Sequence, residues 1–80
     1  MKLPRDLSGR ELASLLCKLG YEVSRQTGSH MRLTTRVGGE HPITIPAQDH
    51  LRIGTLSSIL REVELHQQTT REELLNRLFG

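Results

Sequence analysis

The stretch HMRLTTRVGGEHPITIP, residues 30–46, contains two alternating segments separated by a pair of glycines. Residues 30–35 alternate polar and apolar side chains, which is the pattern of a strand with one buried face. Residues 43–45 alternate again before Pro46, which cannot donate a hydrogen bond to a neighbouring strand. The glycines between the segments can adopt the left-handed backbone of a tight turn. The stretch therefore predicts an antiparallel β-hairpin.

The register of this hairpin follows from the need to bury one apolar face. A two-residue loop would place Leu33 opposite Thr44 and mix apolar with polar side chains. A three-residue loop with one glycine at a bulge places Leu33 opposite Ile43 and Met31 opposite Ile45, and we expect this register. The other, open face should then carry four polar side chains: His30, Arg32, Thr34 and Thr44.

Two elements precede the hairpin. Ser8 begins a capping box with Glu11, and leucines then recur on one helical face until a glycine ends the pattern. These signals predict a helix over residues 8–19. Residues 21–25 alternate as a short strand, and a Gly-Ser turn at residues 27–29 joins this strand to the hairpin.

Two helices follow the hairpin, after a connecting loop at residues 46–52. Apolar side chains at helical spacing predict a helix over residues 54–64 with Thr55 as its cap, and a capping box at Thr70 begins a short helical tail. With so little apolar material, both longer helices must pack on the same face of the sheet. The expected fold class is α+β: an α-β-β-β-α domain, with a three-stranded antiparallel sheet, helices on one face and a short C-terminal helix.

The composition limits the classes of function. Eighty residues with 35% hydrophobic side chains form one small domain over residues 1–80, with a core of about 5–65 and a helical tail over 66–80. Its thin core leaves no room for a deep small-molecule cavity. The single cysteine excludes an intrachain disulfide. Without an apolar signal core or a membrane-spanning run, we expect a cytoplasmic protein.

Positive charge is concentrated in the middle of the chain. The formal net charge is only +2, but residues 25–36 contain three arginines and no acidic residue. A guanidinium group binds phosphate with two parallel hydrogen bonds. We therefore expect this segment to form an anion-binding surface.

His30 is the candidate catalytic residue. A histidine at the start of a strand is usually an ordinary surface residue. This one follows a Gly-Ser turn that can bring backbone amides close to an anion, and it should lie beside Arg32 on the open face. An imidazole beside a guanidinium supplies a proton carrier and a charge that stabilises an oxyanion. Metal-free cleavage of a phosphodiester needs both.

Other chemistries fit the residues less well. The four histidines, His30, His41, His50 and His66, lack ligand spacing, so we expect no metal. A serine nucleophile is not expected, because Ser29 and His30 are neighbours in a strand whose side chains should point to opposite faces. The chain has no P-loop or dinucleotide-binding motif, and we expect no cofactor.

Several motifs together resemble one protein family: Gly28-Ser29-His30, then Ile45-Pro46, then Ile53-Gly54-Thr55-Leu56 followed by Ile59-Leu60. Gly-Ser-His followed about 24 residues later by Gly-Thr-Leu is a specific paired signal. It resembles the HicA toxin family of bacterial type II toxin–antitoxin systems over about residues 5–63.

The resemblance implies a fold like that of double-stranded-RNA-binding domains and ribosome-independent cleavage of mRNA, with His30 as the catalytic residue. It also implies a HicB-type antitoxin that covers the active surface and represses the operon, so that operon DNA is contacted only through the antitoxin. Many family members have a histidine two residues after the proline of the third strand. Here that position is Gln48, and the nearest histidine is His50.

We therefore interpret the chain as an mRNA endoribonuclease in which His30 acts as general acid or base without metal. Single-stranded RNA would be held through its phosphates on the open face. The candidate RNA-binding residues are Ser29, Arg25, Arg32, Arg36 and Thr55. A non-catalytic RNA-binding module of the same fold would keep the arginines without needing His30. A protein-interaction domain, the other alternative, should show no salt-dependent affinity for RNA. Whether His41 or His50 assists stays open.

Overall fold

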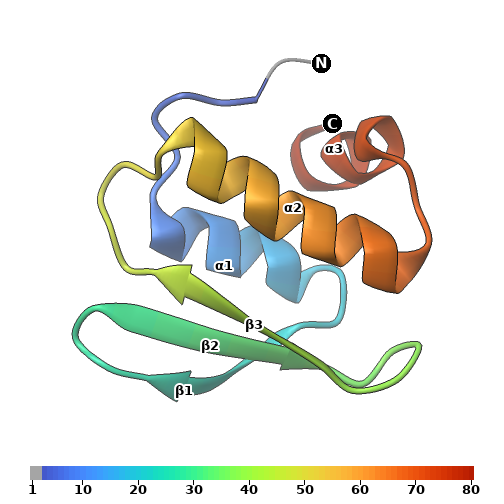
Figure 1. The fold of residues 1–80 in the computed structure, drawn as a ribbon, viewed down its shortest axis with the longest axis horizontal. Helices are drawn as coiled ribbons and strands as arrows, with labels where there is room; N and C mark the ends of the chain where they lie inside the picture. Colours follow the sequence, from blue (N-terminus) through green and yellow to red (C-terminus); the bar gives the residue numbers. More distant parts are fainter. Residues whose placement is uncertain (1–2) are drawn as a thin grey trace.

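The computed structural model describes residues 3–80, so residues 1–2 of the predicted domain lie outside it. Its elements are α1 (Gly9–Cys17), β1 (Glu22–Gln26), β2 (His30–Thr35), β3 (His41–Pro46), α2 (Ile53–Gln67) and α3 (Arg71–Phe79). The strands form one antiparallel sheet with β2 in the centre. α1 and α2 cover one face of this sheet, and α3 lies on the outer side of the helical layer (Figure 1). The predicted fold class, an α+β domain like that of double-stranded-RNA-binding proteins, is confirmed.

The β2–β3 hairpin has the register that burial of one face predicts. Leu33 pairs with Ile43, and Met31 pairs with Ile45. All four side chains are buried, whereas the side chains between them point to the other face. The hydrophobic pattern therefore determines the register of this hairpin.

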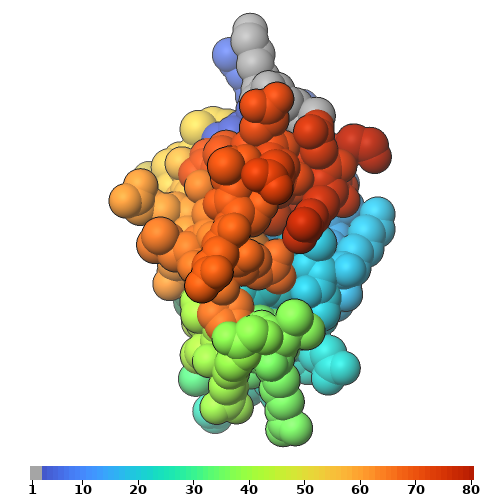
Figure 2. Space-filling view, turned by 90° about the vertical axis from the view of Figure 1, so that its right-hand side faces the viewer, coloured from blue at the N-terminus to red at the C-terminus, as the bar shows by residue number. Residues whose placement is uncertain are grey.

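The hairpin loop is longer than the predicted three residues. The last pair of the ladder is Thr35 with His41, so residues 36–40 form the loop, which projects from one end of the molecule (Figure 2). The amide of Gly39 donates to the carbonyl of Arg36 at 3.1 Å, which makes Arg36 part of the turn rather than of the ladder. Both loop glycines have positive φ angles, 73° and 107°, as such a turn requires.

α1 begins at the predicted capping box. The Ser8 hydroxyl accepts from the amide of Glu11 at 3.0 Å, and the Glu11 carboxylate accepts from the amide of Ser8 at 3.1 Å. Gly9, the first residue of the helix, is buried against the end of β3 and donates its amide to the carbonyl of Gln48 at 2.9 Å. A side chain at Gly9 would collide with the Pro46 carbonyl, so this glycine permits the close approach of helix and strand.

α2 differs from its predicted bounds at both ends. Its N-cap is Arg52, whose carbonyl accepts from the amide of Leu56 at 2.9 Å. The prediction that Thr55 caps the helix is therefore wrong, because Thr55 already lies within the first turn. At the other end the helix continues to Gln67 and stops at Gln68, which adopts a left-handed conformation with φ 53°.

α3 begins where the sequence predicts. The Thr70 hydroxyl accepts from the amide of Glu73 at 3.1 Å. Arg71 forms an ion pair with Glu64 and donates to the carbonyl of Ser57 at 3.2 Å, which holds α3 against α2. No helix within residues 3–80 is both long and apolar enough to cross a membrane.

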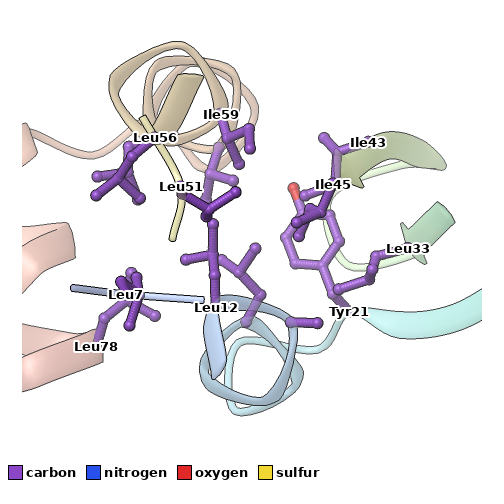
Figure 3. Close-up of a cluster of buried hydrophobic side chains, with 14 of the residues drawn as sticks. Leu7, Leu12, Tyr21, Leu33, Ile43, Ile45, Leu51, Leu56, Ile59 and Leu78 are labelled. Atoms are coloured by element: carbon purple, nitrogen blue, oxygen red, sulfur yellow. The ribbon is translucent and has the colours of Figure 1, made fainter. Parts of the chain in front are cut away.

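One hydrophobic core lies between the sheet and the helices. Leu33 of β2 and Ile45 of β3 face Leu12 of α1 and Leu56 of α2, with the Tyr21 ring beside them (Figure 3). Each of these side chains is at most 1% exposed. Because the apolar side chains of β2 and β3 point into this core, the other face of the sheet is left to polar residues.

Candidate active site on the open face of the sheet

The open face carries the polar side chains that the alternation predicts. His30 and Arg32 are exposed and Thr34 is half-buried, whereas the residues between them in β2 are buried. Thr44 of β3 is exposed and lies directly opposite Arg32. The predicted grouping of these four side chains on one face is confirmed.

A β-bulge in β1 adds a second arginine to this face. Val23 pairs with Leu33, yet Arg25 pairs with Arg32, so Ser24 is an extra residue in the strand. In a regular strand Arg25 would share the helix-covered face with Val23, two residues earlier. The bulge instead places Arg25 beside Arg32. The alternation of residues 21–25 gives no sign of this shift.

His30 is the first residue of β2 and contacts the residue before it. Its Nδ1 atom lies 3.0 Å from the Ser29 hydroxyl, within hydrogen-bond distance. The expectation that these two side chains point to opposite faces is wrong, because Ser29 belongs to the turn that precedes the strand. The structure therefore unites two of the predicted site residues in one small cluster at the end of the sheet.

Thr27 holds the turn that presents His30. Its hydroxyl accepts from the amides of Ser29 at 3.4 Å and His30 at 3.1 Å, and its own amide donates to the His30 carbonyl at 2.9 Å. The amide of Ala47 donates to the Ser29 carbonyl at 2.8 Å and ties the turn to the chain after β3. The turn was expected to bring backbone amides close to an anion, but its Ser29 and His30 amides already donate to the Thr27 hydroxyl. This role of Thr27 was not predicted from the sequence, although threonine hydroxyls often accept a hydrogen bond from a backbone amide two residues later in a turn.

Arg36 and Thr55 lie apart from His30. Arg36 follows the far end of β2, six residues and about 20 Å from His30 along the strand. It lines a shallow depression together with two acidic residues, Glu22 and Glu40. Thr55 is in the first turn of α2, which covers the other face of the sheet. These residues are not brought together with His30, and their contact with RNA stays a prediction.

His41 belongs to a separate cluster at the far end of the sheet, opposite Thr35. Its Nδ1 lies 2.8 Å from the Tyr21 hydroxyl, and its ring stacks on that of His66 with centroids 4.4 Å apart. Burial, with a smaller contribution from Glu62, raises the pKa of Tyr21 to about 12. Burial and then the neighbouring His66 lower the pKa of His41. This location separates His41 from the catalytic candidate.

The remaining histidine of interest, His50, is exposed in the loop between β3 and α2. Within residues 3–80, no three His, Cys, Asp or Glu side chains are grouped as they would be around a metal ion. Around His30, the open face offers an imidazole, the Ser29 hydroxyl and the guanidinium groups of Arg25 and Arg32.

These features define a class: a small α+β domain like a double-stranded-RNA-binding domain, with an exposed histidine and two arginines on its open sheet face. The family model for the HicA toxin of bacterial toxin–antitoxin systems matches residues 9–65, which is most of the chain. The chain belongs to the HicA toxin family, and membership implies a cognate antitoxin. Searches of curated proteins and of solved structures found no significant match.

Proposed function

We propose that this toxin is an endoribonuclease that cleaves mRNA, with His30 as general acid or base and without a metal ion. One observation carries the proposal: an exposed imidazole and the Arg32 guanidinium project from the same face of β2, two residues apart. That spacing is about 7 Å along a strand, close enough for both groups to reach one phosphodiester. Membership of a toxin family supports the same conclusion.

RNA supplies its own nucleophile in the simplest reaction of this site. The 2′-hydroxyl attacks the adjacent phosphorus, a new P–O bond forms, and the bond from phosphorus to the 5′-oxygen of the next nucleotide breaks. His30 takes the proton from the 2′-hydroxyl or gives one to the leaving oxygen, and water handles the other proton. Arg32 stabilises the negative charge that develops on the phosphoryl oxygens. The products are a 2′,3′-cyclic phosphate and a 5′-hydroxyl.

Ser29 leaves a single ring nitrogen for this proton transfer. Because Nδ1 of His30 contacts the Ser29 hydroxyl at 3.0 Å, the transfer falls to Nε2. The hydroxyl also restricts rotation of an otherwise exposed ring. We therefore propose that Ser29 orients the catalytic imidazole. Its predicted contact with RNA is the alternative role, and the kinetics of Ser29→Ala distinguish the two.

The paired arginines of β1 and β2 provide the binding surface for single-stranded RNA. Arg25 and Arg32 lie on neighbouring strands and face the same side, so each can bind a phosphate. The proposed protein partner is a HicB-type antitoxin that covers this face. The toxin would contact operon DNA only indirectly, through this antitoxin. RNA cleavage and antitoxin binding would then compete for one surface.

Cleavage of a single-stranded RNA by purified wild type and by His30→Gln tests the proposal. Glutamine keeps a polar side chain of similar size but carries no proton near neutral pH, so the rate should fall by roughly 10²–10⁴. An exposed side chain contributes little to packing, so the free energy of unfolding should change by at most about 0.5 kcal/mol. Antitoxin and RNA binding should persist. His50→Gln, which changes an exposed loop histidine, is the matched control and should cleave normally.

Two results would overturn this mechanism. Wild-type cleavage by His30→Gln would favour a non-catalytic RNA-binding module whose apparent activity comes from a contaminant. Loss of wild-type activity in EDTA, with recovery on adding a divalent cation, would require a metal-dependent reaction.

A further inference from the structure

A second depression lies away from His30, on the side of the molecule that Figure 2 shows. Its volume is about 480 Å³, and it is bordered by the end of α1, the hairpin loop, the end of α2 and α3. This size accommodates one or two side chains of a partner. The depression lies at the loop end of the sheet, whereas the site at Ser29 and His30 lies at the other end.

The lining of this depression is basic and partly apolar. Lys18 of α1, His66 of α2 and Arg77 of α3 contribute to it, and none of its lining residues in the described chain is acidic. Leu19 and Val37 add aliphatic surface, and 62% of Val37 is exposed. The depression beside Arg36, across the hairpin loop, is lined by two acidic residues and has no such bias. The Lys18–Arg77 depression therefore favours a ligand that combines a negative charge with an apolar group.

The walls of the depression are joined by hydrogen bonds. His66 donates from Nε2 to the carbonyl of Val37 at 2.9 Å, which links α2 to the hairpin loop. The Gln67 side-chain amide donates to the carbonyl of Leu19 at 3.3 Å, which links α2 to the end of α1. A binding surface that is already ordered loses little conformational entropy when it takes up a ligand.

Gln68 lines the depression in an unusual backbone conformation. It ends α2 with φ 53°, a left-handed geometry that glycine adopts at no steric cost. A glutamine at this position retains a side-chain amide that can donate a hydrogen bond to a carboxylate. Because a left-handed residue is a common end of a helix, the feature of Gln68 that bears on binding is its exposed side-chain amide and not its backbone.

We propose that the Lys18–Arg77 depression binds an acidic segment of the antitoxin, with a carboxylate between the two cations and an aliphatic side chain against Leu19 and Val37. The phosphates of RNA would pair with Lys18 and Arg77 but would leave the aliphatic side chains of the depression exposed to water. A polypeptide can pair with the cations and also cover these side chains, so it is the better match. The antitoxin would then hold the toxin at a point outside the RNA-cleaving face. The site rests on its own geometry, and only the identity of the partner rests on the function proposed above.

Nuclear magnetic resonance of the labelled His30→Gln protein tests the site with two peptides, acetyl-Leu-Glu-Leu-amide and acetyl-Leu-Gln-Leu-amide. The glutamate peptide should shift the amide signals of Gly38 and Gln68, and the glutamine peptide should bind at least tenfold more weakly. Arg77→Glu should abolish the shifts. Arg61→Glu reverses an exposed cation of α2 outside the depression and should bind as before. Gln68→Gly should raise the melting temperature yet weaken peptide binding, which a purely structural role would not do.

A second measurement tests the partner. Affinity for the HicB-type antitoxin encoded in the same operon should fall at least tenfold in Arg77→Glu and stay unchanged in Arg61→Glu. Equal shifts with both peptides, or equal losses in both arginine variants, would overturn the site. Shifts of the same signals by a single-stranded oligonucleotide instead of the glutamate peptide would assign the depression to nucleic acid. Because none of these measurements uses RNA cleavage, their failure leaves the proposed catalytic function standing.

Discussion

Arg25 lies directly opposite Arg32 across the β1–β2 pair. Like charges at opposed positions of a sheet destabilise it, and the bulge at Ser24 is what places Arg25 there. The Ser24 hydroxyl lies 2.9 Å from that of Thr34, which fixes the bulged residue on the open face. We therefore expect this pairing of two cations to lower the stability of the sheet, while it supplies the proposed RNA-binding surface with its charge.

Arg25→Gln should therefore change stability and RNA binding in opposite directions. Removing one of two opposed charges should raise the free energy of unfolding by up to about 1 kcal/mol, measured by urea denaturation. Loss of one phosphate contact should reduce the slope of log affinity against log salt by about 0.7 for a single-stranded RNA. Arg61→Gln, which removes an exposed cation of α2 on the other side of the sheet, is the matched control and should leave the slope unchanged. An equal loss of slope in both variants would mean that the effect comes from net charge and not from a phosphate contact at Arg25.

Two glycines in helices should respond to alanine in opposite ways. At Gly9 a new Cβ would collide with the backbone carbonyl of Pro46, which cannot move without displacing β3. Gly9→Ala should therefore lower the free energy of unfolding by about 1–3 kcal/mol or more. At Gly54 a Cβ would meet no neighbouring atom within 4 Å, so Gly54→Ala should raise it by roughly 0.5–1 kcal/mol. Thermal unfolding of both variants measures this, and destabilisation by Gly54→Ala would contradict it.

The His41 cluster should make the fold less stable as the pH falls. Because burial and the adjacent His66 lower the pKa of His41 below its ordinary value of 6.5, the unfolded chain binds a proton before the folded one does. The contribution of His41 to the free energy of unfolding is therefore fully present above about pH 6.5, and it is lost as the pH decreases towards the pKa of His41 in the folded protein. Glu62 opposes this shift, and the neighbouring Tyr21 stays neutral throughout the range.

Urea denaturation between about pH 5 and 8 measures this dependence, since only histidine ordinarily titrates there. His41→Gln should flatten the decline in stability, whereas His50→Gln should leave it as it is in wild type. A decline of the same size in His41→Gln and wild type would assign the pH dependence to another group.

The parts of the fold that could be predicted depend on neighbours in the sequence or on burial of one face. The capping box at Ser8 and the Thr70 side-chain cap, which lacks the reciprocal backbone bond of a full capping box, are local. Only one register of the hairpin buries Met31 with Ile45. The placement of Arg32 on the open face follows from the same alternation. The structure retains these predicted features because no contact with a distant residue favours a different local arrangement.

The features that sequence reasoning missed depend on contacts between distant residues. The bulge at Ser24 is stabilised by its hydroxyl contacts with the carbonyl of Arg32 and with Thr34, eight and ten residues away. The stacking of His41 on His66 joins a strand to a helix. Neither the bulge nor the histidine stacking produces a pattern in the sequence. The charge of residues 25–36 predicts that Arg25 binds an anion, but the sequence does not predict the face of the sheet to which its side chain points.

Ser29→Ala should slow RNA cleavage without weakening RNA binding. The Ser29 hydroxyl lies 3.0 Å from Nδ1 of His30, and its loss frees the ring to rotate away from the substrate. The backbone bonds of Ser29 with Thr27 and Ala47 do not use the side chain, so the turn should keep its shape. A hydrogen bond of this kind is worth about 0.5–1.5 kcal/mol, which corresponds to a roughly twofold to twelvefold fall in kcat.

The split between kcat and KM separates orientation of His30 from contact with RNA. If Ser29 orients the imidazole, Ser29→Ala lowers kcat on a short single-stranded RNA and leaves KM unchanged. Ser29→Thr keeps a hydroxyl at the same position and should restore most of the rate. A rise in KM at constant kcat would instead make Ser29 a contact to the RNA backbone. An equally slow Ser29→Thr would show that the hydroxyl is not the group that matters, because both variants would then act through the shape of the turn.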